Sequence, residues 1–172
     1  MNTIDQFSFS EKKVIIRVDF NVPINNGEVT DNSRIVAASP TIKKIISDGG
    51  ACILMSHLGR PKGIDLALSM SNISKEVERV LGSEILLSKD VVGPDAKSKS
   101  KNLKQGEILL LENLRFHKEE TEGNMAFAKE LSKLADCYIN DAFGTAHRSH
   151  ASTTIVAPVS YTHLTLPTKR IV

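Results

Sequence analysis

The sequence has few aromatic residues and little excess of charge. Its 172 residues include six phenylalanines, two tyrosines and no tryptophan. Proteins that hold single-stranded nucleic acid stack its bases on aromatic side chains, so this scarcity argues against such a partner. The net charge is only +2, which is too small for a general nucleic-acid-binding surface. Any anion site must therefore depend on where individual cations are placed.

Cysteine is also scarce, and both cysteines lie inside apolar runs. Cys52 belongs to the run at residues 51–55, and Cys137 belongs to the run at residues 135–139. Unpaired cysteines usually pack as small buried hydrophobic side chains, and we expect both to do so. A shared metal site is disfavoured because the spacing is wrong and neither cysteine is part of a Cys-x-x-Cys pair.

No long apolar run is present. The first ten residues, MNTIDQFSFS, lack the basic and apolar regions of a signal peptide. No stretch approaches the ~20 apolar residues that cross a bilayer. We therefore expect a cytoplasmic protein with no membrane or nucleic-acid partner. The 41% hydrophobic and 24% charged residues suit a single globular domain.

Short apolar stretches alternate along the chain with helical patterns. Strands are expected at residues 14–18, 51–55, 84–87, 107–111 and 137–140. Helices are expected at residues 35–47, 72–81 and 124–134, and within 90–103 from about Pro94. The alternation predicts an α/β fold: an open, mainly parallel sheet with helices on both faces, a Rossmann-like three-layer sandwich.

One connection departs from this alternation. Asn25, Asn26 and Gly27 precede a short β-prone segment at residues 28–30. Asn-Gly supplies the positive φ angles of a type I′ turn, so a small hairpin is expected. The basic run at residues 97–104, KSKSKNLK, is read as a solvated helix face.

Polar segments follow four of the expected strands. These segments are residues 19–23, 56–61, 112–117 and 141–150. Ligands of open parallel sheets bind at the carboxyl ends of the strands. Because parallel strands end at the same edge, the four segments should meet in one crevice.

Arginine is concentrated at these positions, although the chain has seven arginines and fifteen lysines. Arg60, Arg115 and Arg148 lie in the strand-end segments, and Arg34 opens the helix that starts near Ser33. A guanidinium grips carboxylate or phosphate with two parallel hydrogen bonds. A cation in a first helical turn opposes the helix dipole, at roughly 0.3–1 kcal/mol. Four such arginines therefore predict a small anion that carries both a carboxylate and a phosphate.

Some of these arginines and acids could have a structural role instead of binding a ligand. Arg60 and Arg115 could cap their own strands or pair with Glu112 or Glu119. Asp141 could hold amides of the loop that follows it.

Structural roles are also possible for the other polar residues of these segments. Asp19 and Asn21 could close the turn before Pro23, and His57 could be a core histidine. A metal site at His147 and His150 is disfavoured, because no carboxylate or cysteine cluster accompanies them.

The four segments together resemble the phosphoglycerate kinase family. The matching motifs are RVDFNVP at 17–23, SHLGRP at 56–61, LLLENLRFHKEE at 109–120 and NDAFGTAHRSHAS at 140–152. They occur in the family's order, and the resemblance runs from about residue 5 to about residue 157.

The resemblance implies a glycolytic, monomeric enzyme that moves a phosphoryl group from 1,3-bisphosphoglycerate to ADP, giving 3-phosphoglycerate and ATP. In the family the N-terminal domain holds the glycerate and the C-terminal domain holds Mg²⁺ with ATP or ADP. Arg34 is implied to bind substrate and to stabilise the transferring phosphoryl group during catalysis. The other implied substrate-binding residues are Asp19, Phe20, Asn21, His57, Leu58, Gly59, Arg60, Arg115 and Arg148. No residue of this chain is implied to bind metal or nucleotide.

The chain departs from the family in two respects. A full member is more than twice as long, so residues 1–158 would be the 3-phosphoglycerate-binding domain, with the C-terminal nucleotide-binding domain absent. Residues 159–172 look foreign to the family, and we expect an unstructured tail. The chain alone should then be inactive as a kinase. The alternative is a stand-alone module that binds a sugar-acid phosphate, and the gene sequence downstream would discriminate between the two.

Overall fold

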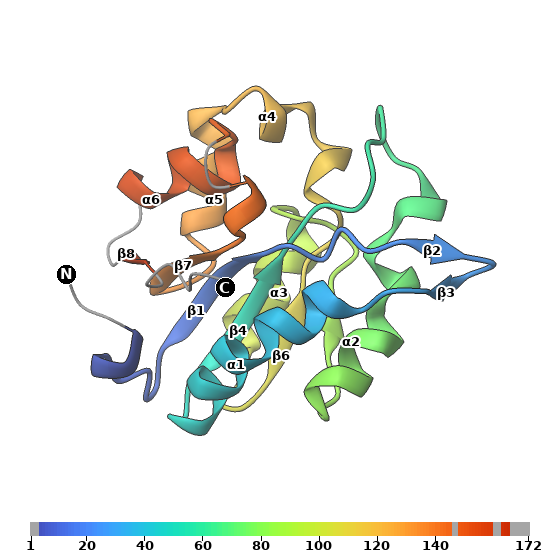
Figure 1. Ribbon diagram of the computed structural model, residues 1–172. Helices are drawn as coiled ribbons and strands as arrows, with labels where there is room; N and C mark the ends of the chain where they lie inside the picture. The colour runs from blue at the N-terminus through green and yellow to red at the C-terminus, as the bar shows by residue number, and fades with distance from the viewer. Residues whose placement is uncertain (1–3, 146–147, 160–162, 166–172) are drawn as a thin grey trace.

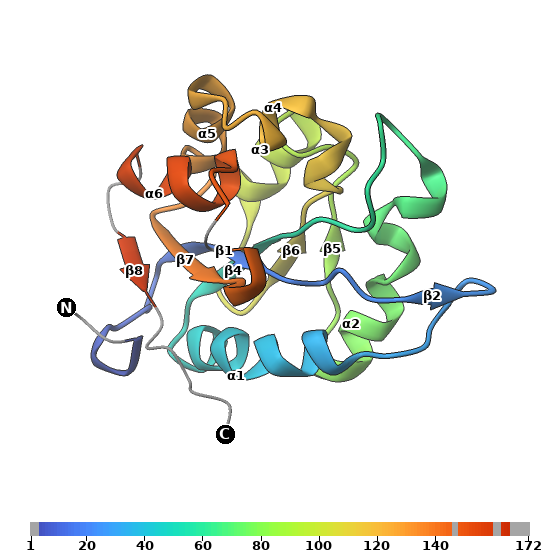
Figure 2. The same cartoon turned by 45° about the horizontal axis from the view of Figure 1, so that its top comes forward.

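A parallel β-sheet forms the centre of the protein (Figure 1). The computed structural model describes residues 4–145, 148–159 and 163–165. The strand order is β5-β6-β4-β1-β7-β8, and all five neighbouring pairs are parallel (Figure 2). The strands are β1 Lys13–Val18, β4 Ala51–Met55, β5 Leu86–Leu87, β6 Ile108–Leu110, β7 Cys137–Asp141 and β8 His163–Thr165. The predicted parallel α/β fold is confirmed.

Helices cover both faces of the sheet (Figure 2). One face packs on α1 (Ser33–Ser47) and α2 (Ser74–Leu81). The other packs on α3 (Pro94–Asn102) and α5 (Met125–Ser132), beside the shorter α4 (Lys118–Thr121) and α6 (Val156–Val159). Single turns of 3₁₀ helix occur at Ile4–Gln6, Leu66–Leu68, Met70–Asn72, Leu114–Phe116 and Phe143–Thr145, and a π-helical turn occurs at Ala151–Ile155.

The strands are apolar on both sides because each face carries its own core. Val14 and Ile16 of β1 pack in the core under α1 and α2. Ile15, between them, packs in the core under α3 and α5. Sheets buried on both faces show such continuous hydrophobic runs. Both cysteines are buried, as predicted, and within the described residues no helix is long and apolar enough to cross a membrane.

The predicted hairpin is also present. Its strands are β2 (Ile24–Asn25) and β3 (Glu28–Val29), paired antiparallel. Asn26 and Gly27 between them have φ angles of 50° and 78°. These are the two positive φ values that a type I′ turn requires.

Several short elements were not anticipated. Besides the 3₁₀ turns, they include α4, α6, the π-helical turn and β8. β8 lies in the range read as a tail, yet it pairs with β7 through Tyr138 and His163, Ile139 and Leu164, and Asn140 and Thr165. Elements of three to five residues give too little periodicity to be read from sequence. The division of the chain at residue 158 stays a prediction.

Candidate functional site

The four polar segments converge at the carboxyl edge of the sheet. The loop after β1 is tied to the loop after β4 by Phe20, whose backbone N–H donates to Ser56 Oγ at 2.9 Å. The loop after β6 joins through Leu114, whose N–H donates to the Ser56 carbonyl at 3.1 Å. Neighbouring parallel strands thus deliver segments distant in sequence to one place.

A chain of hydrogen bonds links five of the predicted site residues across this edge. Arg34 Nη1 donates to Asp19 Oδ2 at 2.6 Å, and the Asn21 N–H donates to Asp19 Oδ1 at 3.3 Å. Asn21 Oδ1 accepts from the Gly59 N–H at 2.8 Å. The Gly59 carbonyl in turn accepts from Arg115 Nη1 at 2.8 Å. The loops after β1, β4 and β6 are therefore positioned relative to one another by the residues predicted to bind the ligand.

Asn113 holds the loop between residues 56 and 68. It is fully buried. Its Oδ1 accepts from the N–H groups of Leu58 (3.2 Å) and Arg115 (3.0 Å). Its Nδ2 donates to the carbonyls of Leu58 (2.8 Å) and Leu68 (2.9 Å). Four bonds satisfy this side chain completely, so the loop is set in one position beside Arg115.

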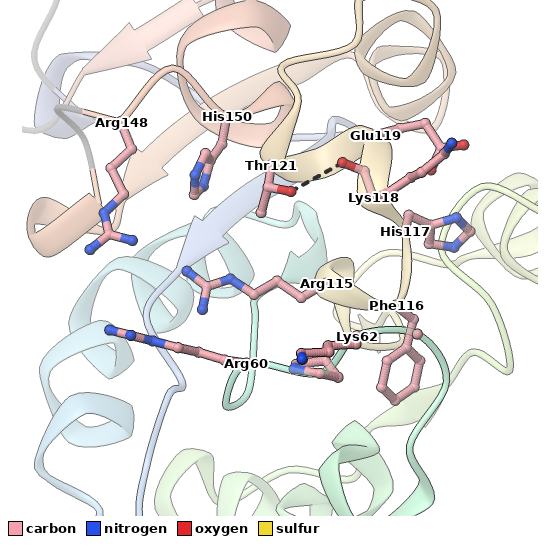
Figure 3. A pocket seen from close by; sticks show the side chains of 12 residues that line it. Arg60, Lys62, Arg115, Phe116, His117, Lys118, Glu119, Thr121, Arg148 and His150 are labelled. Carbon is pink, nitrogen blue, oxygen red and sulfur yellow. Dashed lines mark hydrogen bonds between the residues drawn. The ribbon is translucent and has the colours of Figure 1, made fainter.

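Three arginines point their guanidinium groups into the same cleft (Figure 3). They are Arg60, Arg115 and Arg148. The cleft has a volume of about 920 Å³. It is lined by Arg60, Pro61, Lys62, Gly63, Arg115, Phe116, His117, Lys118, Glu119, Thr121, Arg148 and His150. Five of these residues are lysine or arginine and one is a carboxylate, so the cleft favours an anion.

The positive charges of the cleft repel one another, and Arg115 shows the effect of this repulsion and of burial most clearly. Burial, and then the charges of Arg148 and Arg60, lower the pKa of its guanidinium from the ordinary value. Its Nε–H is buried and has no hydrogen-bond partner within the described part of the chain. An unsatisfied buried donor costs about 1–3 kcal/mol. A bound anion would satisfy that donor and relieve the repulsion among the three cations.

His57 lies in the buried layer beside these residues. It is 4% exposed, and its Nδ1 lies 3.0 Å from Arg17 Nη2. Burial, and then the charges of Arg17 and Arg115, lower the pKa of His57 to about 2. The imidazole is therefore neutral near pH 7. His57 is thus a core histidine, as the structural alternative proposed, and it lies next to the arginine cluster as well.

The remaining predicted residues are placed in different ways. Phe20 and Leu58 have side chains in the core, so only their backbone can serve the site. Asp19 closes a turn with Asn21, in agreement with the structural alternative, and also pairs with Arg34. Arg34 is half exposed and does not line the cleft.

Pairing of the cleft arginines with nearby acids is not observed. Within the described residues no ion pair joins Arg60 or Arg115 to Glu112 or Glu119. Glu112 instead accepts from Ser69 Oγ at 2.7 Å and from the Met70 N–H at 2.8 Å. At the start of α1, Asn32 Nδ2 donates to Glu76 Oε1 at 2.6 Å, and Asn32 makes no side-chain cap of the helix.

Sequence reasoning missed several residues of this region. Arg17 was read only as part of a strand, although it is 1% exposed and contacts His57. A charged residue inside an apolar strand was the available signal. His150 was considered only for metal binding, and it lines the cleft instead. Lys62 and Lys118 also line it.

The described residues do not fit a metal ion. No group of three or more His, Cys, Asp or Glu side chains among them could hold one. His147, which was considered with His150, lies outside the described residues. The cleft is lined by cations, so Mg²⁺ carried by a nucleotide would need ligands from elsewhere.

Fold and site together define the class: a Rossmann-like α/β domain with an arginine-lined anion cleft at the carboxyl edge of its sheet. The family model "Phosphoglycerate kinase" matches residues 4–164. The chain belongs to the phosphoglycerate kinase family, and the match is to its N-terminal region.

Known relatives are longer than this chain. It is 50% identical over 152 residues to phosphoglycerate kinase of Chloroherpeton thalassium and 51% identical over 156 residues to that of Moorella thermoacetica. These alignments cover 88% and 90% of this chain but 38% and 40% of the relatives. The phosphoglycerate kinase structure from Coxiella burnetii is similar with a TM-score of 0.86 and 34% identity, over 96% of this chain and 41% of that one. The chain therefore spans about 40% of the length of its curated relatives.

Proposed function

We propose that this chain is the 3-phosphoglycerate-binding half of a phosphoglycerate kinase. The observation that carries the proposal is the convergence of Arg60, Arg115 and Arg148 on one cleft, whose described lining includes one carboxylate, that of Glu119. Three planar donor groups suit the oxygens of a phosphate. The membership of the family supplies the identity of the ligand.

Arg34 and Asp19 would serve the other end of the same ligand. Their ion pair joins the loop after β1 to the first turn of α1, and hydrogen bonds connect it to Arg115 through Asn21 and Gly59. Phosphoryl transfer needs positioning and positive charge at the transferring group more than covalent help. In the proposal Arg34 supplies that charge at the carboxyl end of the glycerate.

The complete reaction would transfer a phosphoryl group from 1,3-bisphosphoglycerate to ADP, and it needs a second half. Mg²⁺ with ATP or ADP would be held there, because the described residues of this chain do not fit a metal. The chain alone should therefore bind the glycerate without catalysing transfer. We also propose that the complete enzyme is monomeric, cytoplasmic and part of glycolysis.

Isothermal titration calorimetry tests the binding step directly. We expect 3-phosphoglycerate to bind the chain in the absence of nucleotide. Glycerol 3-phosphate should bind more weakly, because it keeps the phosphate and lacks the carboxylate. If neither ligand gives heat with a protein shown by circular dichroism to be folded, the proposed function is wrong.

Arg148→Lys should weaken 3-phosphoglycerate binding although it conserves the charge. Lysine keeps the positive charge and loses the planar donor pair. We expect a loss on the order of 1–2 kcal/mol, as for a hydrogen bond between charged groups. The measurement is the dissociation constant from the same calorimetry.

Arg79→Lys is the matched control for that substitution. Arg79 is an exposed residue of α2, where it pairs with Glu76, on the opposite face of the sheet from α4. Its conversion to lysine should leave the affinity unchanged. Equal affinities of Arg148→Lys and the parent chain would place Arg148 outside the phosphate site.

A further inference from the structure

A buried carboxylate and a buried guanidinium lie next to the arginine cluster, joined by one hydroxyl. Glu120 of α4 and Arg17 of β1 are each 1% exposed, and Ser152 is fully buried. Ser152 Oγ lies 2.5 Å from Glu120 Oε1 and 2.9 Å from Arg17 Nε. The Ser152 N–H donates to Glu120 Oε2 at 3.0 Å. Three elements that are distant in sequence thus meet around one serine.

The donor and acceptor roles in this group follow from chemistry. Arginine can only donate, so Ser152 Oγ accepts from Arg17 and its proton goes to Glu120. The Nη2 of Arg17 faces His57 Nδ1 at 3.0 Å and can again only donate. His57 Nδ1 must therefore accept, which places the proton of the neutral ring on Nε2. If Arg17 were absent, no other hydrogen bond of this group would favour one tautomer of His57 over the other.

Glu120 also anchors the segment that carries two cleft residues. Through the Ser152 N–H it holds the start of the π-helical turn. Within that segment Thr153 Oγ1 donates to the Arg148 carbonyl at 2.7 Å. The adjoining residues Arg148 and His150 line the cleft. One carboxylate thus contacts, directly or through one residue, both the Arg17–His57 pair and the Arg148 segment.

We propose that Glu120 and Ser152 are positioning residues, which hold Arg17 so that His57 keeps its proton on Nε2 and hold Arg148 in place for anion binding. They act through these groups and do not line the cleft themselves. That the bound anion is 3-phosphoglycerate rests on the proposed function. The tautomer of His57 does not depend on it.

Simple electrostatics and positioning predict opposite results for the loss of this carboxylate. Burial lowers the pKa of both Arg115 and His150, and the charge of Glu120 partly opposes that shift. Removing a negative charge near a cationic cleft should, by charge alone, tighten anion binding. If Glu120 positions the cations, its neutralisation should weaken binding instead. The sign of the change separates the two roles.

Three variants test the role of the hydrogen-bonded group Glu120–Ser152–Arg17, called the relay below, in the unliganded chain. Glu120→Gln keeps the shape and removes the charge, and Ser152→Ala removes only the hydroxyl. Glu119→Gln removes the same charge from the neighbouring position of α4, where the side chain lines the cleft and lies outside the relay. Long-range ¹⁵N–¹H NMR correlations of the His57 ring report which nitrogen carries the proton. We expect Nε2–H alone in the parent and in Glu119→Gln, and a mixture of tautomers in the other two.

Calorimetry with inorganic phosphate and with 3-phosphoglycerate completes the test. Glu120→Gln and Ser152→Ala should each bind about 10-fold more weakly, the effect of losing one hydrogen bond to a charged group. Glu119→Gln should bind more tightly, because it removes a negative charge from the lining of the cationic cleft. An unchanged tautomer together with unchanged or tighter binding in both relay variants would overturn the inference. If Glu120→Gln does not fold, Ser152→Ala decides alone. If the folded parent binds neither anion, the proposed function fails while the tautomer comparison still decides the positioning role.

Discussion

Replacing Arg17 with methionine should lower the free energy of unfolding by about 3–5 kcal/mol, the loss seen when one partner of a buried charge pair is removed. Arg17 is 1% exposed and lies between two strands at the centre of the sheet. Burial lowers the pKa of its guanidinium, and the Glu120 charge opposes that shift. Methionine fills a similar volume but removes the buried cation that Ser152 Oγ joins to the buried Glu120 carboxylate. Chemical denaturation followed by circular dichroism measures the effect.

Two further variants test whether the buried charges cause the loss of stability in Arg17→Met. Arg79→Met removes an exposed arginine that pairs with Glu76, and it should cost less than about 1 kcal/mol. Combining Arg17→Met with Glu120→Gln removes both buried charges, so the double variant should be more stable than Arg17→Met alone. If Arg17→Met costs no more than Arg79→Met, or if Glu120→Gln brings no recovery, then Arg17 is not held by the charge of Glu120.

The fold was predictable because its signals are local and repeated. Expected strands of four or five mainly apolar residues alternate with helical patterns, and glycine follows the first two helices, α1 and α2. Asn26-Gly27 predicted a hairpin from two residues. The convergence of Arg60, Arg115 and Arg148 followed from topology alone, because parallel strands end at one edge.

The buried layer under the site could not be predicted in the same way. Arg17 and Ser152 are 135 positions apart, and no local pattern pairs an arginine in a strand with a serine in a later turn. Glu120 lies in a helix of four residues, which is too short to show a buried face. Arg34 points to Asp19 because of tertiary placement, whereas its position in a first helical turn indicated only that it has a partner beyond the helix.

Arg34→Ala should reduce turnover far more than it reduces glycerate affinity. The chain alone should show no kinase activity, so the test requires a chimera in which it is joined to the C-terminal half of a related phosphoglycerate kinase. In the chimera we expect kcat to fall by about 10³–10⁵-fold, as for other arginines that act on transferring phosphoryl groups. Loss of the ion pair with Asp19 should change stability by less than about 1 kcal/mol, because the Arg34 side chain is 51% exposed.

Steady-state kinetics separate the two roles that Arg34 could have. An interaction made mainly in the transition state lowers kcat and kcat/KM together, whereas lost ground-state binding raises KM. Arg34→Lys should recover only part of the rate, since a point charge replaces a planar pair of donors. Arg79→Ala, on the exposed surface of α2, should leave both constants unchanged. If Arg34→Ala raises KM and leaves kcat unaltered, Arg34 holds the substrate and does not stabilise the transferring group.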